Sequence, residues 1–160
     1  MATLAVPEIR IEPGGLGDLD AVDAIMAAAF DPRFGEAWSR AQCAGILPMR
    51  GVDLAVAKRG DTGVGFALWR TILDDSELLL LAVHPLHRGL GLGAMLVDHF
   101  VTEARHAGGR RLHLEVREDN GAIALYRRAG FEVAGRRPDY YRGRDGTKRD
   151  ALTYVLQDRS

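Results

Sequence analysis

The chain has 160 residues, a formal net charge of −1 and a hydrophobic fraction of 47%, which exclude a disordered chain and predict one folded domain, residues 1–160. The lone Cys43 excludes an internal disulfide and a cysteine-rich zinc site and fits a reducing, cytoplasmic location. Residues 1–13 lack the basic start and apolar run of a signal peptide. The most apolar run, residues 78–83, is far shorter than the ~20 residues of a membrane span, so a soluble protein is expected.

The first half of the chain predicts a strand, two helices and three further strands. Residues 8–12 alternate as a strand, Asp18 and Ser39 can cap two helices, and residues 30–38 between these helices are expected as an irregular loop. After residue 50 the period changes to that of strands separated by short turns, which is typical of antiparallel hairpins. These three strands are expected at Val52–Lys58, Val64–Leu73 and Leu78–Val83.

The second half predicts a long helix, a strand, a short helix and two last strands. The long helix carries apolar residues from Leu92 to Ala104 and ends at Gly108-Gly109. A strand at Leu112–Val116, a helix from Asn120 to Gly130, and strands at Phe131–Arg136 and Ala151–Leu156 follow. The order is β-α-α-β-β-β-α-β-α-β-β. A strand–helix–strand unit implies one parallel pair, so we expect a mixed, mostly antiparallel α/β sheet with helices on both faces.

A glycine-rich turn, residues 88–94, follows a buried strand and precedes the long helix. Glycines let the backbone approach a ligand closely, and the start of a helix offers unpaired N–H groups and a positive dipole end. Together these features favour an anion such as a pyrophosphate. The spacing matches neither the P-loop nor the dinucleotide G-x-G-x-x-G pattern.

This turn and the motifs that follow it resemble the acetyl-CoA signature of the GNAT acetyltransferase family. The matching residues are Arg88-x-x-Gly91-x-Gly93 after Leu80–Pro85, then Leu114–Arg117, Asn120, Leu125-Tyr126 and Gly130-Phe131. The resemblance extends over about residues 72–156. It is closest to the branch that acetylates the N-terminal alanine of a ribosomal protein, because of Leu114–Arg117, Tyr140-Tyr141 and Asp150-Ala151.

The resemblance implies that acetyl-CoA is the cosubstrate and that the acetyl group moves directly to an amine in a ternary complex. It implies Glu115 as the general base and Tyr126 as the acid beside the CoA sulfur. The expected cofactor-binding residues are Ala82, Val83, Arg88, Gly89, Leu90, Gly91, Leu92, Gly93, Ala94, Asn120 and Tyr126. The Val83 N–H is expected to meet the oxyanion. The segment from Asn120 to Tyr126 is one residue shorter than is usual in the family, so the helix could start elsewhere or Tyr126 could be rotated.

Two of these roles have structural alternatives. Strand alternation places His113, Glu115 and Arg117 on one face, so Glu115 could instead form an ion pair with Arg117 or another arginine. Tyr126 could be a core residue of an amphipathic helix. No metal is expected, because His84 and His87 have no third ligand spaced with them.

Fewer residues of the sequence indicate which amine accepts the acetyl group. Deprotonating an α-amine, with a pKa of about 7.7–8.0, is easier than deprotonating a lysine of about 10.4, so a carboxylate base suits a protein N-terminus. Tyr140 and Tyr141 are expected to bind it, with Phe34 and Trp38 from the first helix–helix loop. The alternatives are a free small amine or lysine, or a non-catalytic module that binds acetyl-CoA or RNA. Residues 127–149 contain eight Lys/Arg against three Asp/Glu, either a solvated surface or a phosphate-binding patch.

Overall fold

The elements follow one another in the predicted order in a computed structural model that describes residues 8–157. Residues 1–7 and the predicted domain boundaries at 1 and 160 lie outside the described residues. The strands are β1 (Ile9–Pro13), β2 (Val52–Arg59), β3 (Thr62–Ile72), β4 (Asp75–Val83), β5 (Arg111–Arg117), β6 (Glu132–Arg142) and β7 (Lys148–Gln157). The helices are α1 (Leu19–Ala29), α2 (Arg40–Ile46), α3 (Leu92–His106) and α4 (Ile123–Arg128).

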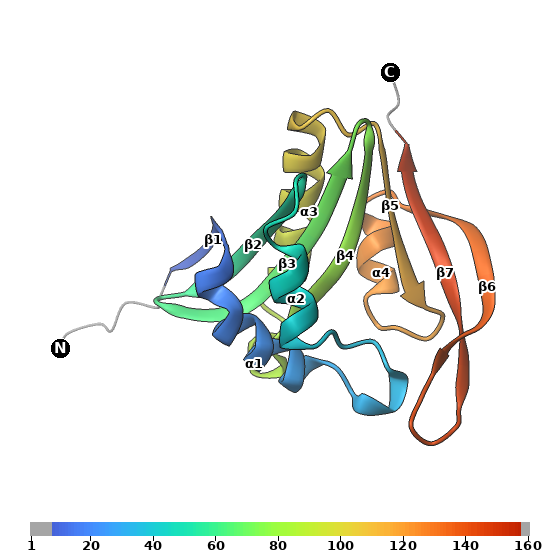
Figure 1. The fold of residues 1–160 in the computed structure, drawn as a ribbon. Coiled ribbons are helices and arrows are strands. Elements are labelled where there is room, and N and C mark those ends of the chain that lie inside the picture. The colour runs from blue at the N-terminus through green and yellow to red at the C-terminus, as the bar shows by residue number, and fades with distance from the viewer. Residues whose placement is uncertain (1–7, 158–160) are drawn as a thin grey trace.

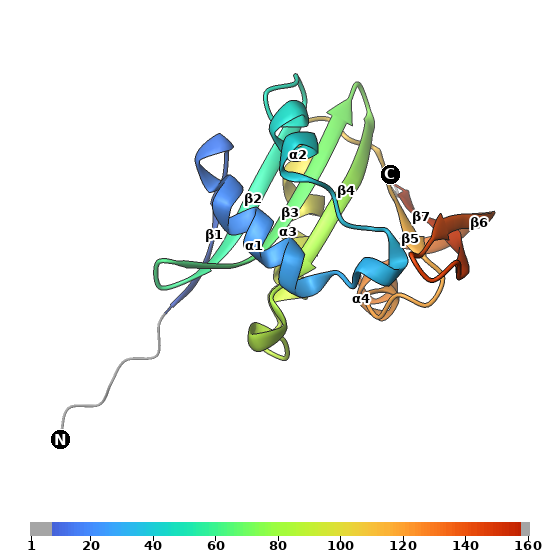
Figure 2. The same cartoon turned by 60° about the horizontal axis from the view of Figure 1, so that its bottom comes forward.

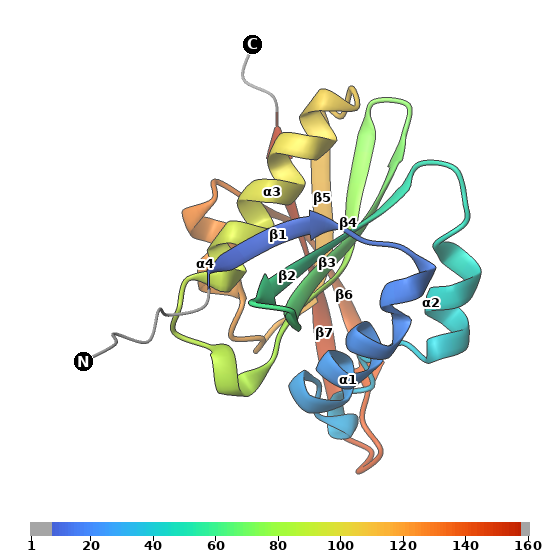
Figure 3. The ribbon, with the colours of Figure 1, turned by 90° about the vertical axis from the view of Figure 1, so that its left-hand side faces the viewer.

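The seven strands form one sheet in the order β1-β2-β3-β4-β5-β7-β6. Every neighbouring pair is antiparallel except β4 and β5, which are joined through α3 and are parallel. Helices α1 and α2 cover one face, and α3 and α4 cover the other (Figures 1 and 3). The predicted mixed sheet with helices on both faces is therefore confirmed.

Each face of the sheet has its own apolar core. On the α3 side, Leu96 and Phe100 of the helix are fully buried against strand residues such as Leu112. On the other side, Ile25 of α1 packs with Phe66 of β3 at about 1% exposure or less. Helices α1 and α3 follow the predicted 3.6-residue period, with one stripe of each buried. None of the helices within residues 8–157 is long and apolar enough to cross a membrane.

The structure differs from the sequence prediction at several element ends. The last two strands are longer than expected, so Tyr140 and Tyr141 lie within β6. Helix α4 begins at Ile123 and not at Asn120, because the Asn120 side chain accepts a hydrogen bond from the Ala122 N–H at 2.8 Å and closes a turn before the helix. Ser39 caps α2 as predicted, accepting from the Gln42 N–H at 3.1 Å.

The segment between α1 and α2, residues 30–39, is called here the α1–α2 loop. It contains one short helical turn at Pro32–Phe34, which Asp31 caps by accepting from the Arg33 N–H at 2.9 Å. The loop runs from α1 past the carboxyl end of β5 to the β6–β7 hairpin (Figures 1 and 2). A segment expected to be irregular thus crosses the end of the sheet where the two cavities described below lie.

Candidate active site

The two parallel strands at the centre of the sheet diverge. Pairing between β4 and β5 covers only Asp75–Leu78 and Arg111–Leu114. At the same level β4 has an extra residue, since Leu68 pairs with Leu80 while its neighbour Trp69 pairs with Leu78. Such a bulge bends a strand and ends its pairing. The carboxyl halves of β4 and β5 therefore open a gap in the sheet.

The backbone of β4 faces this gap with free hydrogen-bonding groups. The His84 N–H donates to the Val64 carbonyl at 2.8 Å, and Val83 is opposite Gly65. Because antiparallel pairs alternate between bonded and non-bonded, the N–H groups of Val83 and Leu81 point away from β3, towards β5. Beyond Leu78 no β5 residue pairs with them. The strand end predicted to meet the cofactor thus directs its backbone polar groups into the opening.

The first cavity, of about 600 Å³, lies between this strand end, the glycine turn and α4, and is called here the glycine-turn cavity. Gly89 and Gly91 have φ of 83° and 78°, the left-handed region that favours glycine. Helix α3 begins at Leu92, so the N–H groups of its first residues have no partner within the helix. A Cβ at Gly93 would lie 3.0 Å from Leu125 of α4, which explains how closely the two helices approach.

Nearly all the expected cofactor-binding residues line this cavity. They are Ala82, Val83, Arg88, Gly89, Gly91, Leu92, Gly93, Ala94, Asn120 and Tyr126. Leu90 does not line it; its side chain is 45% exposed at the tip of the turn. Arg88 and Arg128 add positive charge to the wall. Unpaired amides, a helix N-terminus and two guanidinium groups together suit a polyanionic ligand.

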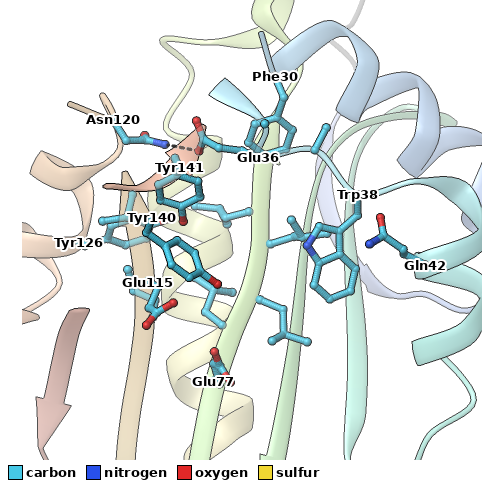
Figure 4. Close-up of a pocket in the computed structure, with 18 of the residues that line it drawn as sticks. Phe30, Glu36, Trp38, Gln42, Glu77, Glu115, Asn120, Tyr126, Tyr140 and Tyr141 are labelled. Carbon is cyan, nitrogen blue, oxygen red and sulfur yellow. Dashed lines mark hydrogen bonds between the residues drawn. The ribbon is translucent and has the colours of Figure 1, made fainter. Parts of the chain in front are cut away.

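The second cavity, of about 440 Å³, lies on the α1–α2 side of the sheet and is called here the tyrosine cavity (Figure 4). Glu115 of β5, Trp38 of the α1–α2 loop, and Tyr140 and Tyr141 of β6 all line it. The two tyrosine rings are perpendicular, with centroids 5.1 Å apart. The sheet thus brings together side chains that are 77 to 103 positions apart in sequence, measured from Trp38 to Glu115 and to Tyr141.

The two cavities meet in the gap between β4 and β5. Five residues line both of them: Phe30, Glu36, Leu81, Asn120 and Tyr126. A ligand in the glycine-turn cavity and a second ligand in the tyrosine cavity would therefore come into contact at Tyr126. This geometry allows a group to pass between two bound molecules without leaving the protein.

Tyr126 is the most deeply buried ionisable group at this junction. Its residue is 6% exposed, and its ring makes an edge contact with Phe131, with the centroids 6.2 Å apart. Burial, with a smaller contribution from Tyr141, raises the pKa of the Tyr126 hydroxyl above its usual value. A tyrosine phenol is protonated at neutral pH in any environment of this kind, and burial favours the neutral form further.

Glu115 forms an ion pair, as one interpretation of the sequence anticipated, but the partner is not Arg117. The Glu115 Oε1 is 2.9 Å from Nε of Arg137 in β6. The Glu115 side chain is 21% exposed and that of Arg137 is 60% exposed, so this pair is open to solvent. Burial, followed by the nearby Glu115 charge, raises the pKa of Tyr141 to about 12. Glu115 therefore combines an ion pair with a place in the cavity wall.

Arg117, which the strand alternation places on the same face of β5 as Glu115, contacts other residues. It forms ion pairs with Glu36 of the α1–α2 loop and with Asp119, and its guanidinium carbon lies 3.7 Å from the centroid of the Phe34 ring. Phe34 consequently lines the glycine-turn cavity and not the tyrosine cavity, where Trp38 lies. Sequence reasoning did not single out Glu36, because no motif or spacing connects it with residue 117.

The arginines of residues 127–149 are partly neutralised by carboxylates. Arg136 contacts Glu118 and Asp150, and Arg149 lies 3.1 Å from Asp119. With Arg137 bound to Glu115, three of the eight basic residues have acidic partners within the site region. These three arginines therefore belong to ion pairs around the site. Within residues 8–157, no cluster of three or more histidine, cysteine or acidic side chains could hold a metal ion.

Two cavities that meet at a buried phenol are the arrangement expected of a group-transfer enzyme with two substrates. Residues 19–131 match the model of the acetyltransferase (GNAT) family. The chain therefore belongs to the GNAT family of acetyltransferases and is an acetyl-CoA-dependent N-acetyltransferase.

Relatives agree with this assignment. The [ribosomal protein bS18]-alanine N-acetyltransferase of Escherichia coli strain K12 is 35% identical over 120 residues, 74% of this chain and 80% of that protein. Its counterpart in Haemophilus influenzae is 35% identical over 89 residues, 56% of this chain and 61% of that protein. The crystal structure of the ribosomal-protein-S18-alanine N-acetyltransferase from E. coli has a TM-score of 0.84 at 31% identity and covers 94% of each chain.

Proposed function

We propose that this enzyme acetylates the N-terminal α-amine of a protein, an alanine-type N-terminus of a ribosomal protein, by direct attack on acetyl-CoA in a ternary complex. The observation that carries the proposal is the junction at Tyr126, where the glycine-turn cavity meets the tyrosine cavity. Relatives named for acetylation of the alanine of ribosomal protein bS18 support the choice of acceptor.

The glycine-turn cavity is the proposed site of acetyl-CoA. The unpaired N–H groups at the start of α3 suit its pyrophosphate, and Arg88 and Arg128 add charge-assisted contacts. The Val83 N–H, directed into the gap, is the proposed donor to the oxyanion that develops on the thioester carbonyl. The acetyl carbon would then lie near Tyr126, where both cavities open.

Glu115 and Tyr126 are the proposed base and acid. Glu115 removes a proton from the acceptor ammonium, directly or through a water molecule, and the neutral amine attacks the carbonyl carbon. As the carbon–sulfur bond breaks, Tyr126 donates its proton to the leaving thiolate. The Tyr126 phenol is protonated at neutral pH, as a tyrosine with a pKa of about 10 or above must be, which is the state that this step requires.

The tyrosine cavity is the proposed site of the acceptor. Tyr140, Tyr141 and Trp38 offer aromatic walls, and the exposed edge of Tyr140 leaves the cavity open to solvent. An opening of this kind lets a peptide N-terminus enter while the rest of its chain stays outside. An α-amine also needs less driving force for deprotonation than a lysine, by about 3 kcal/mol at neutral pH.

The test is release of CoA with a panel of acceptors. It contains peptides that begin with Ala, Ser or Met, a lysine peptide blocked at its N-terminus, and small polyamines. Turnover is expected with the free Ala peptide, and acetylation of its N-terminus should be visible as a mass gain at the first residue. Turnover with polyamines or the blocked peptide alone would refute the proposed acceptor. Tight binding of acetyl-CoA without turnover of any amine would contradict the proposed acceptor and favour a non-catalytic sensor or an acceptor outside the panel.

A further inference from the structure

The α1–α2 loop is held from two sides at the junction of the cavities. On one side it contacts the end of β5 and the turn before α4, and on the other the β6–β7 hairpin (Figures 1 and 2). Neither contact is used by the proposed acetyl transfer.

The contact with β5 is a buried network of charge and hydrogen bonds. Glu36 forms an ion pair with Arg117, and the side chains of both residues are only 11% exposed. Glu36 also accepts a hydrogen bond from Asn120 Nδ2 at 3.2 Å (Figure 4). Phe34 lies against the Arg117 guanidinium, 3.7 Å from the ring centroid. One loop carboxylate is thus bonded to two residues that line the glycine-turn cavity.

The contact with the hairpin is a close approach of backbones. A Cβ at Gly143 would lie 1.6 Å from the Arg33 carbonyl oxygen, so only glycine fits there. Gly35, with φ of 67°, would place a Cβ 3.0 Å from the Arg142 carbonyl oxygen. Arg142, like Glu36, lines the tyrosine cavity. A displacement of the loop therefore changes the wall of the tyrosine cavity.

A buried ion pair is a poor way to gain stability, because desolvation of both charges offsets most of their attraction. An apolar contact could hold the loop equally well. Glu36 instead connects the two cavities, both of which it lines. It forms an ion pair with Arg117 and a hydrogen bond with Asn120, and both of these residues line the glycine-turn cavity. A ligand that fixes Asn120 and Arg117 would fix Glu36 with them.

We infer that Glu36 is a positioning residue, which couples occupancy of the glycine-turn cavity to the position of the α1–α2 loop and so to the shape of the acceptor cavity. The inference rests on the proposed location of acetyl-CoA. Coupling between two sites is reciprocal and typically changes affinity about 5–150-fold. Bound cofactor should therefore tighten acceptor binding, and bound acceptor should tighten cofactor binding to the same extent.

The variant that tests this is Glu36→Gln. Glutamine keeps the shape and an oxygen for the Asn120 amide but cannot pair ionically with Arg117. The matched control is Glu12→Gln, the same change in a carboxylate of β1 that pairs with Arg10 and Lys58 at the far edge of the sheet. Phe34→Leu, which removes the stacking on Arg117, serves as a second variant if Glu36→Gln does not fold. Circular dichroism and thermal melting check folding of all three.

The readout is hydrogen exchange with and without CoA, which needs no acceptor. In the wild type and Glu12→Gln, CoA should slow exchange of residues 30–39 about tenfold, within the range of coupling given above. In Glu36→Gln this protection should be lost while protection of residues 88–94 remains. In Glu36→Gln, the affinity for the acceptor in the presence of CoA and the affinity for CoA in the presence of acceptor should both fall about tenfold, whereas CoA binding without acceptor should change little.

The exchange pattern separates failure of this inference from failure of the proposed function. If CoA slows hydrogen exchange of residues 88–94, and slows that of residues 30–39 equally in the wild type and in Glu36→Gln, the role of Glu36 is overturned and the proposed cofactor site is not. If CoA slows exchange of residues 88–94 in the wild type but does not slow exchange of residues 30–39, the role of Glu36 is likewise overturned. Absence of protection at 88–94 would overturn the proposed cofactor site and the inference together.

Discussion

The ion pair between Glu115 and Arg137 allows stability and catalysis to be tested separately. Replacing either residue by glutamine breaks the same 2.9 Å contact. Only Glu115→Gln removes the proposed base. If Glu115 is merely structural, the two variants should behave alike; if it is catalytic, they should differ in rate and agree in stability.

The expected magnitudes follow from exposure. The Arg137 side chain is 60% exposed, so solvent screens the pair and its contribution to the free energy of unfolding is about 0–1 kcal/mol. For a domain of this size, that corresponds to a fall in melting temperature of at most about 4 °C. Loss of a general base typically costs 10²–10⁴ in rate, equivalent to about 2.7–5.4 kcal/mol of activation free energy. The catalytic effect should therefore far exceed the effect on stability.

The assay is kcat for CoA release at saturating acetyl-CoA and acceptor, with thermal melting of the same samples. Glu115→Gln should lose about 10²–10⁴ in kcat, and Arg137→Gln should stay within about threefold of the wild type, a change of less than 1 kcal/mol. A Glu115→Gln enzyme within about fivefold of the wild type would refute the role of Glu115 as base. Equal losses of rate in both variants would show that the ion pair, and not the base, matters.

Two further predictions concern the buried tyrosines and the loop–hairpin contact. Burial raises the pKa of Tyr126 and raises that of Tyr141 to about 12, whereas an unfolded tyrosine titrates near 10. The stability that their neutral forms contribute is thus fully present below about pH 10 and is lost as pH rises through the folded pKa values. In denaturant titrations at about pH 9–11, the double variant Tyr126→Phe/Tyr141→Phe should therefore lose less stability than the wild type. Equal losses of stability in the two proteins would contradict this prediction. Gly143→Ala, whose Cβ would meet the Arg33 carbonyl oxygen at 1.6 Å, should destabilise the protein by about 1–3 kcal/mol and raise KM for the acceptor. Its control Gly135→Ala, on β6 with nothing nearer than 3.9 Å, should stay within about 0.5 kcal/mol, and equal unfolding midpoints for the two variants would argue against the close contact.

Local sequence determined the element order and the glycine turn at the first cavity. The apolar period from Leu92 to Ala104 predicts α3, and the glycines before it predict a turn at the N-terminus of this helix, which the structure contains. These features depend on spacing within a few residues, which the sequence displays directly. The same holds for Ser39, whose side chain caps α2 through a residue three positions away.

Only the tertiary structure shows how the tyrosine cavity and the contacts around it are built. The partner of Glu115 is Arg137 and not Arg117. Arg137 belongs to β6, which the strand order β5-β7-β6 places two strands away from Glu115 in the same sheet. Glu36 meets Asn120 across 84 positions, and the bulge that opens β4 from β5 is visible only in the register of the strands. Side-chain partners across such separations depend on strand order, register and loop packing. Periodicity does not encode these quantities, so the roles of Glu115 and Tyr126 stay predictions from the sequence, and the contacts around them are visible only in the fold.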